Sequence, residues 1–280
     1  MHSKNEIKHG STQPEIPVRA SLLAIGGVDP SGGAGVLIDS AAAKRAGLHC
    51  AAVCAVNTVQ DGLSFLNSDV QNINSVKQSI DLIFASQNVT AVKTGALGTA
   101  PMIEAVSGAL TGQSDDFFLV VDPVLGSTSG GTLTEYSSLD TFKTRLLPLA
   151  TLVTPNLFEA SKLCGFNVNN IQTMEKAGHA LVETGVANVL VKGGHLEGPR
   201  AVDVLVFSDH TVKHFAERKI PAGEVRGTGC ALASLTASYL GTGQTLENAV
   251  ILARKVLLDA IKNAYFAGKG PGILDFDNIL

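Results

Sequence analysis

Short apolar segments alternate with helical segments along most of the chain, and this alternation limits the possible folds more than any other feature. Apolar runs of strand length occupy residues 22–25, 51–56, 89–92, 117–121, 152–153 and 189–191. Helix-length patterns occupy residues 34–46, 73–86, 100–110, 138–147, 174–183, 230–240 and 246–265. Strands that are apolar along their whole length are buried on both faces, so the pattern predicts an α/β fold with a mainly parallel sheet between helices.

The remaining sequence adds one hairpin and no sign of a second domain. Apolar runs at residues 204–206 and 212–215 flank the polar segment 208–211, which predicts an antiparallel hairpin at a sheet edge. No stretch is rich enough in Pro, Gly or Ser to be a linker. We therefore expect a single domain over residues 21–280. Residues 1–20 are polar and lack an apolar run, so we expect a flexible tail rather than a signal peptide or anchor.

Composition excludes several classes of partner. The 280 residues are 45% hydrophobic and 16% charged, with a net charge of −4, so no basic excess is present to bind nucleic acid. No apolar run approaches the roughly 18 residues of a membrane helix, so we expect no membrane partner. The 4 cysteines form no C-x-x-C pair and no zinc pattern. Reduced thiols in a cytoplasmic protein fit this spacing.

Polar residues and glycines follow each of the six predicted parallel strands. They lie at residues 26–33, 60, 93–95, 122–123, 155–156 and 192–195. In an open parallel sheet, ligands bind in the crevice beyond the carboxyl ends of the strands. One such turn is ordinary loop chemistry, but six in succession predict a shared site.

The segment 226–230 joins a glycine turn to the start of an apolar helix. Gly227 and Gly229 allow backbone N–H groups to converge, and the helix N-terminus adds about half a positive charge. The segment therefore predicts a phosphate-binding turn. The same field favours a thiolate, so Cys230 is expected to have a pKa below about 8.5. The alternative is a simple turn followed by a buried cysteine.

Two carboxylates and one lysine follow predicted strands without any Walker A or G-x-G-x-x-G pattern. Asp122 and Glu159 have the chemistry to hold Mg²⁺, directly or through water. Alternatively, Asp122 shapes a turn, and Glu159 lies in the first turn of a helix capped by Asn156. Lys192 would meet nucleotide phosphates as a point charge, or else be a solvated lysine at a strand end.

These groups are the set that phosphoryl transfer requires. The protein must position a nucleophile, neutralise phosphate oxygens and offer N–H donors to the moving group. Cys230 would be the general base that accepts a proton from the acceptor hydroxyl. A serine hydrolase is disfavoured because no G-x-S-x-G segment occurs.

Six ordered segments together resemble the hydroxymethylpyrimidine/phosphomethylpyrimidine kinases, which belong to the ribokinase-like superfamily. They read DPSGGAG (29–35), VKTG (92–95), VDPV (121–124), LVTPNLFEA (152–160), VKGGH (191–195) and GTGC (227–230). The resemblance covers residues 21–273. It implies a three-layer α/β/α fold, ATP with Mg²⁺, and transfer to 4-amino-5-hydroxymethyl-2-methylpyrimidine and then to its monophosphate in thiamine biosynthesis.

The resemblance also implies a role for each matching residue. The catalytic base is Cys230, with an anion hole at Gly227, Thr228 and Gly229. The residues implied for ATP are Lys192, Asn156, Glu159 and Thr228, and those for Mg²⁺ are Asp122 and Glu159. The implied acceptor contacts are Asp39, Gln60, Gly27, Ala34 and Ala96. The amide of Gln60 offers a donor and an acceptor to an aminopyrimidine edge.

Departures from the family pattern gather on the acceptor side. Ala96 replaces a usual methionine, and Leu37 a frequent glutamine. Arg226 replaces a common histidine, and either adds charge toward a phosphorylated acceptor or is a solvated loop residue. Leu125 and Thr128 stand where methionine and lysine are frequent. A pyridoxal/pyridoxine kinase and a non-catalytic pyrimidine-binding module therefore stay open as alternatives, and a homodimer is compatible with either.

Overall fold

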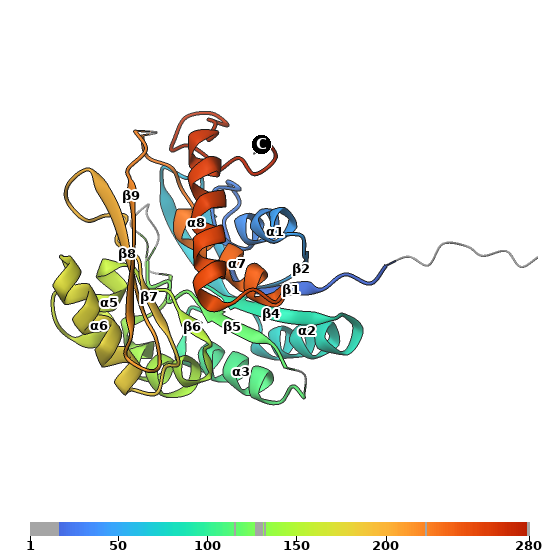
Figure 1. Cartoon of the computed structure of the whole chain (residues 1–280). Helices are drawn as coiled ribbons and strands as arrows, with labels where there is room; N and C mark the ends of the chain where they lie inside the picture. The colour runs from blue at the N-terminus through green and yellow to red at the C-terminus, as the bar shows by residue number, and fades with distance from the viewer. Residues whose placement is uncertain (1–16, 115, 127–130, 132, 222, 279–280) are drawn as a thin grey trace, which may run out of the picture.

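A single nine-stranded sheet runs through the centre of the computed structural model, with helices on both faces (Figure 1). The structure describes residues 17–114, 116–126, 131, 133–221 and 223–278. The spatial order of the strands is β3-β2-β1-β4-β5-β6-β7-β8-β9. Their bounds are β1 Ser21–Val28, β2 His49–Gln60, β3 Phe65–Val70, β4 Val89–Thr94, β5 Phe118–Val121, β6 Leu152–Val153, β7 Val189–Val191, β8 Arg200–Val206 and β9 Val212–Arg218.

Strands β2, β1, β4, β5, β6 and β7 are parallel. At the two edges, β3 pairs antiparallel with β2, β8 pairs antiparallel with β7, and β9 pairs antiparallel with β8. The helices are α1 Gly35–Arg45, α2 Ile73–Ser86, α3 Ala100–Thr111, α4 Leu139–Thr141, α5 Leu157–Cys164, α6 Ile171–Glu183, α7 Thr228–Gly241 and α8 Leu246–Lys262. Short segments η1 Tyr136–Ser138, η2 Phe142–Leu146 and η3 Leu147–Leu149 surround α4. The three-layer, mainly parallel prediction is confirmed.

Successive side chains along each strand point alternately into two hydrophobic cores, one on each face of the sheet. On β1, Leu22 packs with α1, α7 and α8, whereas Leu23 packs with the core on the opposite face, which α2, α3 and α6 cover (Figure 1). Each strand residue is buried by one helical layer because successive side chains point to opposite faces. Because the six central strands are parallel, their carboxyl ends lie at one edge of the sheet. Among the described residues, no helix is long and apolar enough to cross a bilayer.

The structure also contains elements that the apolar pattern did not predict. Strand β3 was missed because its side chains are mostly exposed, so the sequence shows no apolar run there. The helix expected at 138–147 is present as part of a continuous helical run over residues 136–149, in which the short segments η1, α4, η2 and η3 follow one another without a break. The expected tail falls mainly on residues 1–16, which lie outside the described residues.

Candidate functional site

A cavity of about 500 Å³ opens beyond the carboxyl ends of the parallel strands. All six predicted strand-end segments contribute to its wall, together with the start of α7. The predicted site residues that line it are Gly27, Ala34, Asp39, Gln60, Ala96, Asp122, Asn156, Glu159, Lys192, Gly227, Thr228, Gly229 and Cys230. The fold therefore brings the whole predicted set together, although their positions alone do not test their roles.

The turn before α7 leaves the N-terminus of this helix without a side-chain cap. Gly227 is the N-cap residue, with a left-handed φ of 75°, and no side chain caps the helix. A Cβ at position 227 would overlap the carbonyl oxygen of Gly33, so only glycine fits without displacement. The first-turn amides of α7 thus face the cavity without a side-chain acceptor, as a phosphate-binding turn requires.

Cys230 lies in the first turn of α7 and lines the cavity. Removal from water raises the pKa of its thiol, and the nearby Asp39 and Asp122 carboxylates raise it further. Lys93 and the backbone N–H of Gly35 lower this pKa, but they do not reverse the effect of burial. The expectation of a lowered thiol pKa is therefore wrong, because burial outweighs the field of the helix.

Asp39 is a fully buried residue whose carboxylate is occupied by protein partners. Lys93 Nζ donates to both carboxylate oxygens at 2.9 Å, and Ser234 Oγ donates to Oδ1 at 2.7 Å. Although burial lowers the pKa of Lys93, its partner Asp39 raises it overall. Ser234 lies one helical turn after Cys230, so this ion pair sits beneath the thiol. A lysine inside the apolar β4 strand was the sequence signal for this pair.

Lys192 follows β7 and is only 9% exposed, which shows that the solvated-lysine alternative is wrong. Its Nζ donates to Asp122 Oδ1 at 2.6 Å, and Thr154 donates to the same oxygen at 3.2 Å. A Cβ placed on Gly229 would lie 3.2 Å from Lys192 Nζ. The ammonium group is therefore adjacent to the glycine turn, where phosphate oxygens would meet it.

Asn156 and Glu159 form a reciprocal capping box at the start of α5. The Glu159 N–H donates to Asn156 Oδ1 at 2.9 Å, and the Asn156 N–H donates to Glu159 Oε2 at 2.8 Å. The predicted position of Glu159, in the first turn of a helix capped by Asn156, is thus confirmed. Burial raises the pKa of Glu159 to about 7; Lys192 opposes this shift and Asp122 adds to it.

The two carboxylates Asp122 and Glu159 suit Mg²⁺ better than a metal that needs a complete protein cage. Within the described part of the chain, no group of three or more His, Cys, Asp or Glu side chains is arranged to hold a metal ion. Mg²⁺ commonly takes one or two carboxylates and completes its shell with water and substrate phosphates. The donor set therefore fits that ion.

The raised pKa of Glu159 predicts a pH-dependent stability. The folded carboxyl holds its proton up to about pH 7, whereas the unfolded one releases it near 4.5. Because the native state binds the extra proton between these values, the free energy of unfolding should fall as pH rises through this window, by on the order of 3 kcal/mol. Urea unfolding of Glu159→Gln without Mg²⁺ should lack this component. Identical pH profiles for the two proteins would contradict the assignment.

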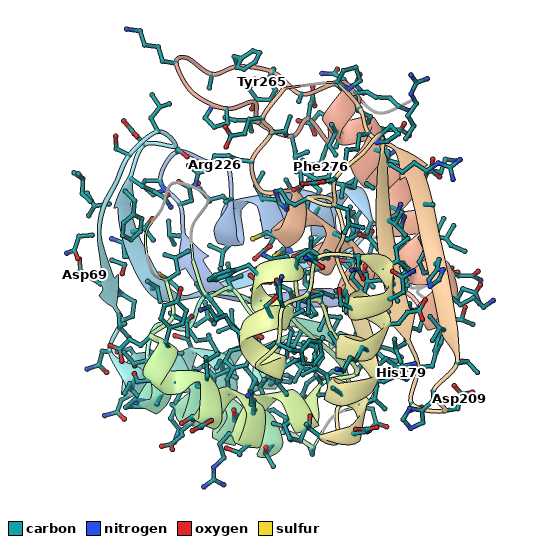
Figure 2. The ribbon with its side chains drawn as sticks, turned by 90° about the vertical axis from the view of Figure 1, so that its left-hand side faces the viewer. Asp69, His179, Asp209, Arg226, Tyr265 and Phe276 are labelled. Carbon is teal, nitrogen blue, oxygen red and sulfur yellow. The ribbon has the colours of Figure 1, made fainter. Side chains whose placement is uncertain are left out.

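Arg226 is buried, with 5% exposure, so the solvated-loop interpretation is wrong. Figure 2 shows it in the upper part of the molecule, where Tyr265 and Phe276 are also labelled. Its Nη2 donates to Gln60 Oε1 at 3.0 Å and lies 3.3 Å from Asp29 Oδ2. Gln60 Nε2 in turn donates to Thr58 Oγ1 at 2.9 Å. Both ends of the Gln60 amide thus already have protein partners, which sequence reasoning did not anticipate.

Only some of the departures from the family pattern touch the cavity. Ala96 lines it, and a Cβ placed on Gly27 would lie 3.5 Å from the Ala96 Cβ. Leu37 is 48% exposed, and Leu125 is fully buried in the protein; neither is among the lining residues that the structure describes. Thr128 lies outside the described residues. The altered pocket is therefore due to Ala96 and Arg226.

Comparison with known proteins gives consistent matches. Residues 29–275 match the family model described as phosphomethylpyrimidine kinase. The hydroxymethylpyrimidine/phosphomethylpyrimidine kinase of Streptomyces coelicolor is 35% identical over 266 residues, covering 94% of this chain and 97% of that protein. The thiamine biosynthesis bifunctional protein ThiED of Geobacter sulfurreducens is 35% identical over 256 residues, or 91% of this chain. This chain spans about half, 51%, of the Geobacter protein's length.

Among solved structures, the pyridoxal kinase from Staphylococcus aureus in complex with AMP-PCP and pyridoxal is similar in fold. The TM-score is 0.84, the sequence identity is 26%, and the match covers 93% of this chain and 94% of that one. Its sequence identity is lower than that of the pyrimidine kinases, which favours the latter as the source of functional expectations. The three-layer fold implied by the ribokinase-like resemblance is confirmed.

Proposed function

The chain belongs to the phosphomethylpyrimidine kinase family, and from this premise we propose that it phosphorylates 4-amino-5-hydroxymethyl-2-methylpyrimidine and then its monophosphate, using ATP. This would make it a cytoplasmic phosphotransferase of thiamine biosynthesis. The observation that carries the proposal is the shared cavity, in which the Cys230 thiol, the uncapped turn at Gly227 and the Lys192 ammonium meet. Binding alone would not require all three.

Each group has a distinct task in the proposed transfer. The amides of residues 227–229 receive the oxygens of the migrating phosphoryl group, and Lys192 neutralises the charge on the donor side. In its thiolate form, Cys230 Sγ accepts the proton from the acceptor hydroxyl in the first transfer. Asp122 and Glu159 would hold Mg²⁺, which supplies charge neutralisation at the donor phosphates. Asp39 positions Lys93 and Ser234, because both side chains donate hydrogen bonds to its carboxylate.

A pyridoxal/pyridoxine kinase is the second candidate, and two observations favour it. The S. aureus pyridoxal kinase shares the fold closely, and Ala96 leaves more room than a larger side chain would. Both acceptors are small aromatic rings that carry a hydroxymethyl arm.

An acceptor panel separates the two candidates. We expect ATP consumption, followed as ADP release, with the hydroxymethylpyrimidine and with its monophosphate, and little with pyridoxal or pyridoxine. Mass spectrometry of the products identifies the phosphate ester formed. Turnover with the B6 vitamers alone would replace the first proposal with the second.

A further inference from the structure

Four buried cationic side chains line the cavity within the described residues, and one of them differs from the others. Lys93, Lys192 and Arg254 each donate a hydrogen bond to a buried carboxylate. Arg226 is only 3.3 Å from Asp29 Oδ2, without hydrogen-bond geometry, and that oxygen has no other partner in the described structure. Arg226 is therefore the weakly held cation of the cavity.

The guanidinium group of Arg226 also has unused donors. An arginine carries five N–H donors in a planar arrangement. Nη2 donates to Gln60, but neither Nε nor Nη1 has a hydrogen-bond partner among the described residues, and both atoms are buried. Leaving a buried donor without a partner costs about 1–3 kcal/mol, and more for a charged group. A movement of Arg226 that gives these donors a polar partner would remove this cost.

The side chain of Arg226 lies on the side of the cavity where the acceptor is expected to bind. It directly precedes Gly227 of the phosphate-binding turn, and its backbone N–H is fixed by the carbonyl of Gly272 at 3.0 Å. Its side chain extends toward Gln60 at the end of β2, whereas Lys192 follows β7, on the other side of β1 in the sheet. The two cations are thus separated along the sheet. Lys192 lies toward the expected phosphate donor, and Arg226 lies toward the expected acceptor.

We propose that Arg226 binds the phosphate of the phosphorylated acceptor and thereby favours the second phosphorylation over the first. This inference rests on the proposed function. Gly62 lies beside the guanidinium, since a Cβ on Gly62 would be 3.4 Å from Nη1. Binding therefore requires Arg226 to turn into the cavity, which breaks its hydrogen bond to Gln60 and its ion pair with Asp29. A phosphate then gains the planar donor array of arginine.

The test compares two acceptors in the same variant. Arg226→Gln should lower kcat/KM for the pyrimidine monophosphate by about 10- to 100-fold, the loss typical of a charged hydrogen bond, and change that for the alcohol less than about 3-fold. Arg226→Lys keeps the charge and should recover part of the loss. Arg200→Gln is the matched control and should change neither value, because Arg200 is exposed at the start of β8 and is not among the described residues that line the cavity.

Binding without ATP provides an independent measurement. Calorimetry should show weaker monophosphate binding to Arg226→Gln and unchanged alcohol binding, with inorganic phosphate as a probe of the anion site. An equal loss for both acceptors would show that Arg226 only supports the turn, and would overturn the inference. An absence of transfer by the wild-type protein to either acceptor would instead refute the proposed function, so the two failures are distinguishable.

Discussion

Replacing Cys230 with alanine is expected to lower kcat by about 10²- to 10⁴-fold, the usual contribution of a positioned general base. The thiol lines the cavity beside the phosphate-binding turn, where the proton of an acceptor hydroxyl must leave. Acceptor affinity should change little, because the ring contacts come from other segments. Steady-state kinetics and calorimetry with the pyrimidine acceptor measure the two effects separately.

The pH dependence of kcat adds a signature that a structural role would not produce. Because burial raises the pKa of the Cys230 thiol, the reactive thiolate fraction increases as pH rises above neutrality. The kcat of the wild-type protein should increase as pH rises above neutrality, and the residual kcat of Cys230→Ala should lack this increase.

A matched thiol separates the base from cysteine chemistry in general. Cys164→Ala is the control, since that partly buried thiol packs at the end of α5 and donates to the Ala177 carbonyl. Unchanged transfer by Cys230→Ala would remove the thiol from the mechanism. Ligand binding by the wild-type protein without any transfer would support the non-catalytic module instead.

The location of the site could be predicted from sequence because it depends on chain direction alone. Once the apolar runs predict parallel strands, their carboxyl ends must meet at one edge, and the polar residues that follow must line it. Asp122 and Lys192 were found in this way, from opposite halves of the chain. The same reasoning predicted the capping alternative for Glu159, because Asn156 stands three residues before it.

The partners of buried charges could not be predicted, because they depend on side-chain packing between elements far apart in sequence. Asp39 and Lys93 are 54 residues apart, and Arg226 and Gln60 are 166 apart. The prediction of a lowered pKa for the Cys230 thiol was wrong for a related reason. The field of the helix N-terminus is a local property of the sequence, but burial is a property of the fold. The sequence therefore predicted which residues form the site, and only the packed structure showed which of their charges are already paired.

Gly227→Ala should abolish most transfer by displacing the phosphate-binding turn. Two effects combine at this position: the left-handed φ of 75° and the overlap of a Cβ with the Gly33 carbonyl. The first costs about 1–2 kcal/mol of stability for a non-glycine residue. The second moves the amides away from the phosphate, and misplacing one such donor lowers kcat by about 10²- to 10³-fold.

Gly243→Ala isolates the backbone strain from the loss of geometry. Gly243 follows the other end of α7 with a φ of 88°, and a Cβ there would meet no atom within 4 Å. Thermal unfolding should therefore show destabilisation in both variants, and kinetics a large loss of kcat in Gly227→Ala alone. If both variants kept the same activity, the amides of this turn would not be the donors that receive the phosphoryl group, because their displacement would then have no effect on the transition state.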